Sequence, residues 1–509
     1  MPATAAPATR SRKKSASRAA EDSFDAIVIG TGMGGSACGA ILAKHGFRTL
    51  ILEKNPRVGG SCSWYEKDGF RIDMGTHMFI RGNKGPFGVC TKRLGMGTPI
   101  EFRRTRDIAW VRGFNIDARM PSDPRRLPVF ALQVLVQSGL PLTALPSIIR
   151  MFRDIVTMPQ DRIEYWDTRT IDEFMSVYTK DPFVHTLIGF LLGLYFILPT
   201  WQASAGESIW NLQHFLRDNS LSYPKGGSAI IPQTFLKGAE AHGAQVMTMA
   251  GVEKILVEDG KATGVIARGN RTFRAPVVIS TSSMQDTMFR MVGKEYLSEA
   301  YAKRVQAIKG SYIAVQAKIG LKKGVTRAGC ICGGYPRKID RNQMNHETMI
   351  ETFRQLESGK VAPFTPIYCP IPTNFDPGLA PPGMQLLTAC AVAPTTDVEL
   401  DDGPKKWIDN MLTAVYDMVP GSREQVVFED TFSVQAIASW IGKSSGAAVT
   451  TGQTPDQVGK NRPGHRTPIR GLYMCGDAAG SRGVGTELAC QSGMECADLI
   501  ADERRNFLI

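Results

Sequence analysis

Residues 25–53 constrain the fold more than any other stretch of this chain, and they read DAIVIGTGMGGSACGAILAKHGFRTLILE. The apolar run Ala26–Ile29 predicts a buried strand, and the apolar segment Ala40–Ala43 predicts a helix. Thr49–Leu52 predicts a second strand. A strand, a helix and a second strand in this order form a βαβ unit, which places two parallel strands in an α/β sheet.

Three glycines follow the first strand with the spacing G-x-G-x-x-G. Gly30 allows a tight turn, Gly32 lets the backbone approach a pyrophosphate, and Gly35 lets the helix pack closely on the strand. The helix N-terminus offers N–H groups to the phosphates. Glu53 ends the second strand, where its carboxylate can accept hydrogen bonds from ribose hydroxyls. The pattern indicates a dinucleotide site; the alternative is an ordinary βαβ unit with a glycine-rich turn.

The residues just downstream favour FAD over NAD. The segment 54–61 reads KNPRVGGS, and its pair Gly59-Gly60 predicts a second close approach of backbone to the nucleotide. The segment 68–77 reads DGFRIDMGTH. In it, Gly69-Phe70 predicts a hairpin turn, and Asp73-Met74-Gly75 predicts a tight return toward the cofactor. Plain turn chemistry is the alternative for these glycines.

The C-terminal region supplies a second half for the same site. Leu472–Cys475 predicts a short buried strand that ends in Gly476-Asp477. A glycine-rich loop with Gly480, Gly483 and Gly485 then leads into a helix from about Thr486. The Asp477 carboxylate can bind ribityl hydroxyls, and N–H groups at the helix start can face the electron-rich edge of a flavin. Alone, such a loop is also compatible with other catalytic turns.

These motifs resemble those of the FAD-dependent phytoene desaturase, carotenoid isomerase and retinol saturase family. The likeness covers about residues 24–500 and is carried by four blocks: the fingerprint with KNPRVGG, DGFRIDMGTH, residues 223–265, and TPIRGLYMCGD. In the third block a Gly226-Gly227 turn precedes a helix, and Gly260 turns a hairpin. The resemblance and the adjoining loops imply FAD contacts at the following residues: Gly30, Gly32, Gly35, Glu53, Lys54, Gly59, Gly60, Val252, Gly476, Asp477 and Gly485.

The resemblance implies an α/β fold: a Rossmann-type FAD-binding domain of the glutathione-reductase and amine-oxidase kind, with a discontinuous α+β substrate domain. Both chain ends converge on one cofactor, so the middle of the chain must form the second domain. We expect a flexible basic tail over 1–22. The FAD-binding domain is expected to comprise 23–102, 221–310 and 460–509, and the substrate domain 103–220 and 311–459.

The chain departs from the family pattern at the expected flavin edge. Family desaturases commonly carry a Pro-Gly-x-Gly loop after the Gly-Asp pair, whereas residues 481–487 here read SRGVGTE. Ser61 also stands where arginine is frequent in such flavoproteins. These differences put the substrate in doubt more than the cofactor.

The charge distribution limits which partners are expected. Lysine and arginine exceed the acids by 12. The first 20 residues contain no acid and five basic residues: Arg10, Arg12, Lys13, Lys14 and Arg18. The tail is a solubilising arm, a membrane tether or a transit peptide. The other basic residues are dispersed and no binding module appears, so we expect no nucleic-acid partner. No apolar signal-peptide core follows the tail, which favours a cytoplasmic protein, peripheral on a membrane at most.

The cysteines predict a reducing compartment and no metal site. The ten cysteines contain no C-x-x-C motif. Cys330 and Cys332 form a C-x-C pair without histidine partners, which favours ordinary thiols over metal ligands.

Two segments are unusually apolar. Residues 127–151 are interrupted by Pro141 and Pro146, so they cannot form one clean spanning helix. Residues 187–198 are too short to span a bilayer and end at Pro199. One interpretation is a buried helix of the substrate domain. The other is a lipid tunnel or an insertion into one leaflet, with Arg125, Arg126 and Arg150 facing headgroups.

Catalytic candidates are few. Glu487 lies in the loop expected to meet the flavin, where it serves as an acid or base or caps the following helix. His77 is either a site residue or a packing histidine, and Tyr195 contacts substrate or packs in the core. Arg482 either stabilises reduced flavin or is solvated.

Three functions are compatible with these motifs. The first is an FAD-dependent desaturase, which moves a hydride from a CH–CH bond of a hydrophobic carotenoid or isoprenoid-like substrate to flavin N5 and passes electrons to quinone or oxygen. The second is a saturase or cis–trans isomerase of a polyene, or a desaturase of a small alicyclic ketone or acid. The third is a non-catalytic binder like the prenyl-binding dissociation inhibitors, which the intact pyrophosphate loop and Gly476-Asp477 disfavour.

Overall fold

The fold is taken from a computed structural model that describes residues 23–75, 78–218, 221–340, 343 and 345–506. Its first sheet is parallel and five-stranded, in the order β19-β13-β1-β2-β9. The strands are β1 (Ala26–Ile29), β2 (Thr49–Leu52), β9 (Gln245–Met247), β13 (Val277–Ser280) and β19 (Leu472–Met474). They come from the three stretches 23–102, 221–310 and 460–509. The Rossmann-type α/β fold expected from the sequence is therefore confirmed.

Both faces of this sheet are covered, as the all-apolar strands require. Ala26 and Val28 of β1 face four helices, whereas Ile27 and Ile29 face a three-stranded antiparallel sheet. The helices are α2 (Met33–Lys44), α3 (Pro86–Arg93), α10 (Ile230–Ala241) and α16 (Gly485–Arg505). The small sheet contains β10 (Val252–Glu258), β11 (Lys261–Ala267) and β12 (Arg271–Arg274), with α11 (Glu299–Ala307) beside it.

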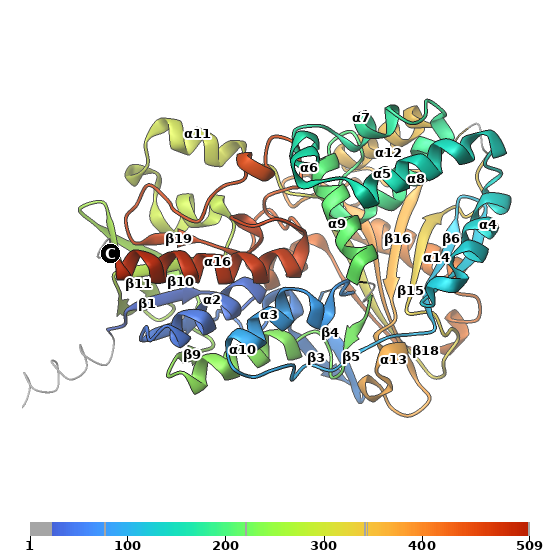
Figure 1. The fold of residues 1–509 in the computed structure, drawn as a ribbon. Helices are drawn as coiled ribbons and strands as arrows, with labels where there is room; N and C mark the ends of the chain where they lie inside the picture. Colours follow the sequence, from blue (N-terminus) through green and yellow to red (C-terminus); the bar gives the residue numbers. More distant parts are fainter. Residues whose placement is uncertain (1–22, 76–77, 219–220, 341–342, 344, 507–509) are drawn as a thin grey trace, which may run out of the picture.

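The two ends of the described chain meet in this half of the molecule. Strand β13 pairs with β1 on one side and with β19 on the other. Helix α16 lies against α2 (Figure 1), and a Cβ at Gly493 would stand 2.2 Å from the Gly34 carbonyl oxygen. Only glycines permit two helices to approach so closely. The first and last parts of the chain thus form one packed unit.

The second sheet is seven-stranded, in the order β18-β14-β17-β16-β15-β6-β7. Its strands are β6 (Asp107–Gly113), β7 (Ile116–Pro121), β14 (Ile313–Leu321), β15 (Cys330–Tyr335), β16 (Thr365–Pro370), β17 (Gln385–Ala393) and β18 (Val426–Phe432). Alternate residues of β14, such as Val315, Ala317 and Ile319, share an apolar cluster with α14 (Gly403–Met418). Gln316 and Lys318 therefore face the other side, toward the first half of the molecule.

A helical layer covers the second sheet at the end of the molecule far from the C-terminus of α16 (Figure 1). It contains α4 (Leu127–Ser138), α5 (Leu145–Thr157), α6 (Gln160–Asp167), α7 (Ile171–Ser176), α8 (Pro182–Phe196), α9 (Ala205–Asp218) and α12 (His346–Glu357). The break between α4 and α5 confirms that the apolar segment 127–151 is not one helix. None of the helices in the described part of the chain has the length and apolar character needed to cross a bilayer.

Short elements complete the fold: hairpin strands β3 (Trp64–Lys67) and β4 (Phe70–Asp73), the pair β5 (Phe102–Arg103) and β8 (Tyr223–Pro224), and helices α13 (Pro372–Phe375) and α15 (Val434–Ile441). The turn of the hairpin is Asp68-Gly69, both at positive φ, so the expected turn at Gly69-Phe70 is wrong by one residue. Phe70 is fully buried in β4, and burial of its ring fixes the start of the strand.

Candidate functional site

Three glycine loops from distant parts of the chain meet at the carboxyl end of the first sheet. A Cβ at Gly60 would lie 3.1 Å from the Gly32 Cα, and a Cβ at Gly34 would lie 2.7 Å from the Gly476 Cα. The Gly59 N–H donates to the Thr31 hydroxyl oxygen at 3.1 Å. The edge of a parallel sheet where these loops gather is the usual ligand-binding edge of such folds.

The glycines of the fingerprint differ in what surrounds them. A Cβ at Gly35 would stand 2.0 Å from the Gly30 carbonyl oxygen, so Gly35 serves helix–strand packing. Gly30 has φ +100° and makes the turn. A Cβ at Gly32 would meet no described atom within 4 Å, and the same holds at Gly485 at the start of α16. Both glycines stand at helix N-termini, where the first N–H groups are not used within the helix, and the open space beside them fits the phosphates and flavin edge of FAD.

Glu53 lies where the dinucleotide pattern requires an acid. It is buried at the end of β2, and its carboxylate accepts hydrogen bonds from the Thr31 N–H at 3.1 Å and the Asn55 N–H at 2.9 Å. The Glu53 carbonyl accepts from the Ala250 N–H at 2.8 Å, which brings the start of β10, and so Val252, beside the acid. The carboxylate is held in place next to the glycine loop, as a ribose contact needs.

The Lys54 side chain contacts helix α15 and the glycine that follows it. Its ammonium group donates to the Ser439 carbonyl of α15, and its alkyl chain lies against Gly442. Asn55 binds the next carbonyl, that of Trp440, at 2.9 Å. The structure therefore anchors Lys54 on α15, and its cofactor role stays a prediction.

Asp477 is buried and carries an ion pair that the sequence patterns missed. Its Oδ2 accepts from the Lys443 ammonium at 2.7 Å and from the Thr450 N–H at 2.8 Å. The positive charge of Lys443 and the backbone donor outweigh the effect of burial and lower the pKa of the Asp477 carboxyl. Asp477 is thus a fixed anion at the sheet edge. Lys443 follows α15 without any local motif, so no pattern in the sequence pointed to it.

Arg482 is not solvated, which corrects one alternative from the sequence. It forms an ion pair with Asp167 of α6 and lies 3.5 Å from Glu207 of α9. Glu207 also accepts from the Gly483 N–H at 3.1 Å. Glu207 is 1% exposed, and burial raises its pKa to about 7 despite Arg482 nearby. The 481–487 loop is therefore bound to the helical layer by buried charges.

Glu487 does not cap α16, so that expectation is wrong. Its Oε1 accepts from the Arg81 backbone N–H at 3.0 Å, in the segment after β4, and α16 has no side-chain cap. Burial of the carboxyl raises the pKa of Glu487 to about 7. A carboxyl that titrates near neutral pH suits an acid or base, and the catalytic role of Glu487 stays a prediction.

A buried lysine is the functional candidate that sequence reasoning missed. Lys318 of β14 is 0% exposed, and its Nζ donates to the Gly75 carbonyl at 3.3 Å and to Gln316 at 3.0 Å. Burial lowers its pKa to about 8. Gly75 in turn donates to the Ser61 carbonyl in the second glycine loop at 2.9 Å. A lysine inside the apolar run IAVQAKIGL was the signal available in the sequence.

Asp73, close to this lysine, is also buried and perturbed. Its Oδ2 accepts from the Ser228 N–H at 3.0 Å and from the Tyr223 hydroxyl. Burial raises the pKa of Asp73 to about 6, while the charge of Lys318 opposes the shift. Two groups that titrate within the range pH 6–8 thus lie between the two halves of the molecule, which is typical of active sites.

An apolar cavity lies between the helical layer and the second sheet. Its closed volume is about 50 Å³. The apolar part of its wall includes Ile197, Leu198, Trp201, Met349, Phe353 and Val392, and Asp172, His185 and His346 add polar groups. The mostly apolar lining of this cavity favours a hydrophobic ligand.

Backbone contacts connect the cavity wall to the flavin loop. The Ile197 carbonyl accepts from the Tyr312 N–H at 3.2 Å, and the adjacent Ser311 N–H donates to the Val449 carbonyl at 3.0 Å. Thr450, next to Val449, holds Asp477. Two paired segments, 311–312 and 449–450, therefore connect the cavity wall to Asp477 at the sheet edge.

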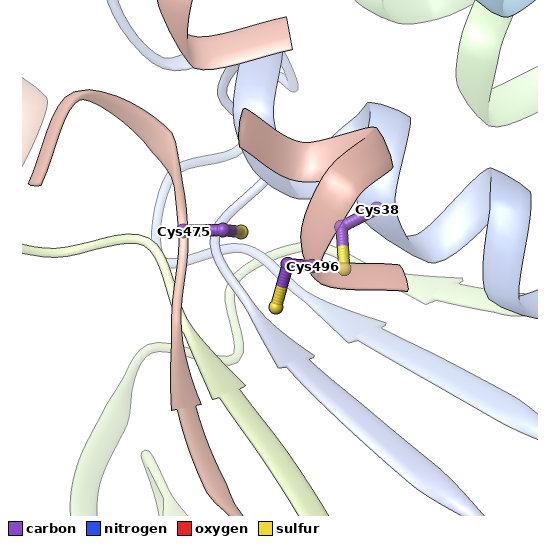
Figure 2. A group of neighbouring side chains, drawn as sticks. All are labelled: Cys38, Cys475 and Cys496. Carbon is purple, nitrogen blue, oxygen red and sulfur yellow. The ribbon is translucent and has the colours of Figure 1, made fainter. Parts of the chain in front are cut away.

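Three buried thiols pack behind the glycine loops, as Figure 2 shows. Cys38 of α2, Cys475 after β19 and Cys496 of α16 are 0% exposed, and their Sγ atoms lie within 4.8 Å of one another. They belong to the apolar cluster between the sheet and its helices. The C-x-C pair singled out in the sequence lies elsewhere, in β15, so spacing along the chain did not reveal this group.

Two candidates from the sequence are not described. His77 and the side chain of Tyr195 lie outside the described residues.

Comparison with known proteins places these features in a family. Residues 33–501 match the family of flavin-containing amine oxidoreductases. A chloroplastic prolycopene isomerase of an Oncidium hybrid cultivar is 26% identical over 94% of this chain and 84% of its own length. An all-trans-retinol 13,14-reductase of Danio rerio is 25% identical over 91% of this chain and 83% of its own length. An oxidoreductase of Methanosarcina mazei has a similar crystal structure, with a TM-score of 0.68, 21% identity, and coverage of 93% of this chain and 99% of that one.

Proposed function

Since this chain belongs to the family of flavin-containing amine oxidoreductases and is an FAD-dependent oxidoreductase, we propose that it acts on carbon–carbon bonds of a hydrophobic polyene. The first candidate reaction is the desaturation of a CH–CH bond in a carotenoid or isoprenoid-like chain. Quinone or oxygen would then take up the electrons.

The apolar cavity is the observation that carries this proposal. Its walls offer large apolar side chains and few polar groups, which suits an extended hydrocarbon rather than a charged amine. The printed names of two relatives, a prolycopene isomerase and a retinol reductase, also refer to polyenes. A small alicyclic ketone or acid is less favoured because most of the wall is apolar.

Lys318 and Glu487 are the residues proposed to handle protons. FAD, when bound, accepts or donates a hydride at N5. Lys318 Nζ is positioned beside the Gly75 carbonyl, and its lowered pKa lets it release or hold a proton near pH 8. The Glu487 carboxyl titrates near pH 7 and is held by the Arg81 N–H. The apolar wall keeps water from the reacting chain.

A second candidate is supported by the names of the relatives. Saturation or cis–trans isomerisation of a polyene would use the same site with FAD in its reduced form. A non-catalytic binder on this fold is disfavoured, because the glycine loops retain the open space that a nucleotide needs. Purification of a yellow protein with flavin absorbance would exclude the binder.

Anaerobic mixing of the FAD-loaded protein with polyenes separates the candidates. Oxidised protein that bleaches and yields a product with two fewer hydrogens would indicate a desaturase. Reduced protein that regains its colour and yields a product with two more hydrogens would indicate a saturase. A changed isomer without net flavin change would indicate an isomerase. The proposal fails if amines or a cyclic ketone react and none of the polyenes does.

A further inference from the structure

Exposed large apolar side chains gather on one part of the surface. Eight of the fifteen such residues in the described chain lie within residues 129–156. They are Val129, Leu132, Val136, Leu142, Leu145, Ile149, Phe152 and Val156, and we call them the apolar surface of α4 and α5. Soluble proteins rarely expose so many large apolar side chains on two successive helices without a binding partner.

Helix α4 is apolar around its whole circumference and yet lies on the surface. Phe130 and Val134 pack on a core cluster formed by β6, β7 and α8, whereas Val136 is 70% exposed. Only Gln133 and Gln137 interrupt its outward side between Leu127 and Ser138. A helix apolar on all sides is normally covered by protein or lipid, so the outward side of α4 lacks a cover in the described chain.

Helix α5 carries two adjacent apolar stripes, one buried and one exposed. Met151 and Ile155 are buried in the helical layer. Leu145, Ile149, Phe152 and Val156 follow the same helical spacing on the outward side and are exposed. Leu142, 74% exposed, lies in the short connection before α5 and extends this stripe toward α4.

Arginines border the apolar surface. Arg125 and Arg126 are exposed immediately before α4, and Arg150 and Arg153 are exposed on α5 between its apolar residues. Arg153 contacts Asp154 at 2.9 Å, and Arg150 lies over the Tyr178 ring. A long arginine can keep its charge at the headgroup level while its stem lies against apolar residues.

From this juxtaposition we propose that the apolar surface of α4 and α5 docks into one leaflet of a membrane that contains anionic lipids. Apolar side chains enter the acyl boundary, and the bordering arginines bind phosphate groups of the headgroups. The formal net charge of +12 favours association with an anionic surface in general. A protein partner or a second copy would need an apolar surface bordered by acidic groups and shaped to match this one. An anionic membrane provides acyl chains and phosphate groups without the need for a matching shape.

The position of α8 indicates that docking serves to deliver substrate from the membrane. This role rests on the proposed function. Phe183 and Leu187 of α8 belong to the cluster on which α4 packs, and Val184 and Ile188 belong to the cluster of α5. On another side of α8, His185 and Thr186 line the apolar cavity. One helix thus separates the lipid-facing surface from the proposed substrate site.

Co-sedimentation with vesicles tests the docking without any substrate. Full-length, FAD-loaded protein is mixed with vesicles of phosphatidylcholine alone or with added phosphatidylglycerol. We expect binding to both, stronger with phosphatidylglycerol and weakened by salt. The triple variant Val136→Glu, Leu142→Glu, Ile149→Glu should bind at least tenfold more weakly. The control Val89→Glu, Met249→Glu, Val427→Glu adds the same charge at exposed apolar positions elsewhere and should bind like wild type.

Further measurements distinguish loss of lipid binding from misfolding and from self-association. FAD absorbance and circular dichroism verify the fold of each variant. If the triple variant misfolds, Arg125→Gln with Arg126→Gln replaces it and should remove most of the preference for anionic lipid. Wild type that stays in solution with both vesicle types overturns the proposal. A lipid-free dimer that the triple variant dissociates also overturns it, in favour of self-association. Delivery is tested separately: the triple variant should keep its rate on detergent-dispersed polyene and lose rate on vesicle-embedded polyene.

Discussion

Substitution of Gly32 by alanine should separate cofactor binding from folding. A Cβ at Gly32 meets no described atom within 4 Å, and the backbone there has φ −59° and ψ 177°, which alanine adopts without strain. The folded apoprotein should therefore tolerate the methyl group. The cofactor should not, because the glycine pattern predicts that the pyrophosphate approaches this Cα directly.

The expected magnitudes differ clearly. For the apoprotein, loss of a flexible glycine from the unfolded chain changes stability by about 0.4–1 kcal/mol in the favourable direction. For FAD binding, an extra methyl group in a close contact costs about 1–3 kcal/mol. Since about 1.4 kcal/mol corresponds to tenfold in affinity, the dissociation constant of FAD should rise roughly 5- to 150-fold.

Flavin fluorescence quenching gives the FAD affinity, and thermal unfolding with and without FAD gives the stability. Gly34→Ala is the packing counterpart: its Cβ would stand 2.7 Å from the Gly476 Cα, so it should destabilise the protein even without FAD. Gly464→Ala, which also meets nothing within 4 Å, should leave FAD affinity unchanged and raise stability by the same small amount. Gly32→Ala with wild-type FAD affinity would refute the assignment of this loop to the pyrophosphate.

Three further outcomes are expected. Glu487→Gln should slow flavin reduction by polyene without loss of FAD. Burial raises the pKa of Glu487 to about 7, so wild type should lose more stability than the variant as pH rises from about 4.5 through 7, a range in which Asp73 and Glu207 titrate in both proteins. Equal rates and equal pH profiles would remove Glu487 from the mechanism. Lys318→Met should slow the reaction at least tenfold and abolish a pH dependence near 8 while FAD stays bound; an unchanged rate would exclude Lys318 as a proton carrier. Cys38→Ala should leave FAD content unchanged, and elemental analysis should find no bound metal; one zinc or copper ion per chain, lost in the variant, would show that Cys38, Cys475 and Cys496 are ligands.

The nucleotide-binding half was predictable because its rules are local. Apolar strands, fixed glycine spacing and a terminal acid place β1, α2, β2 and Glu53 from 29 consecutive residues. The pairing of β19 with β13 follows once Gly476-Asp477 is assigned to the same cofactor. Helix α16 begins at Gly485, one residue before the expected start.

In the other half of the molecule, the side-chain contacts depend on tertiary packing and cannot be predicted from residue spacing along the chain. Lys318 faces Gly75 only because β14 pairs between β17 and β18 with one particular register. A shift of one residue would turn the lysine toward α14. Likewise, Lys443 reaches Asp477 across the fold, and Glu207 reaches Gly483 over 276 residues of chain. Such partners depend on tertiary packing, and therefore the sequence predicted Glu487 as a candidate but not Lys318, Lys443 or Glu207.

The unusual loop at 481–487 illustrates this limit and changes how its charge is understood. From sequence, Arg482 adds a positive charge at the flavin edge. In the structure Asp167 and Glu207 face Arg482, and Arg462 binds the carbonyls of Gly480 and Asp477 at 2.7 and 2.8 Å. Two arginines and two carboxylates balance when all are ionised, and a buried set of this kind is costly to break by removal of one member. The loop therefore couples the cofactor half to the helical layer, so a change in Arg482 alone would act on the position of that layer before it acts on the flavin.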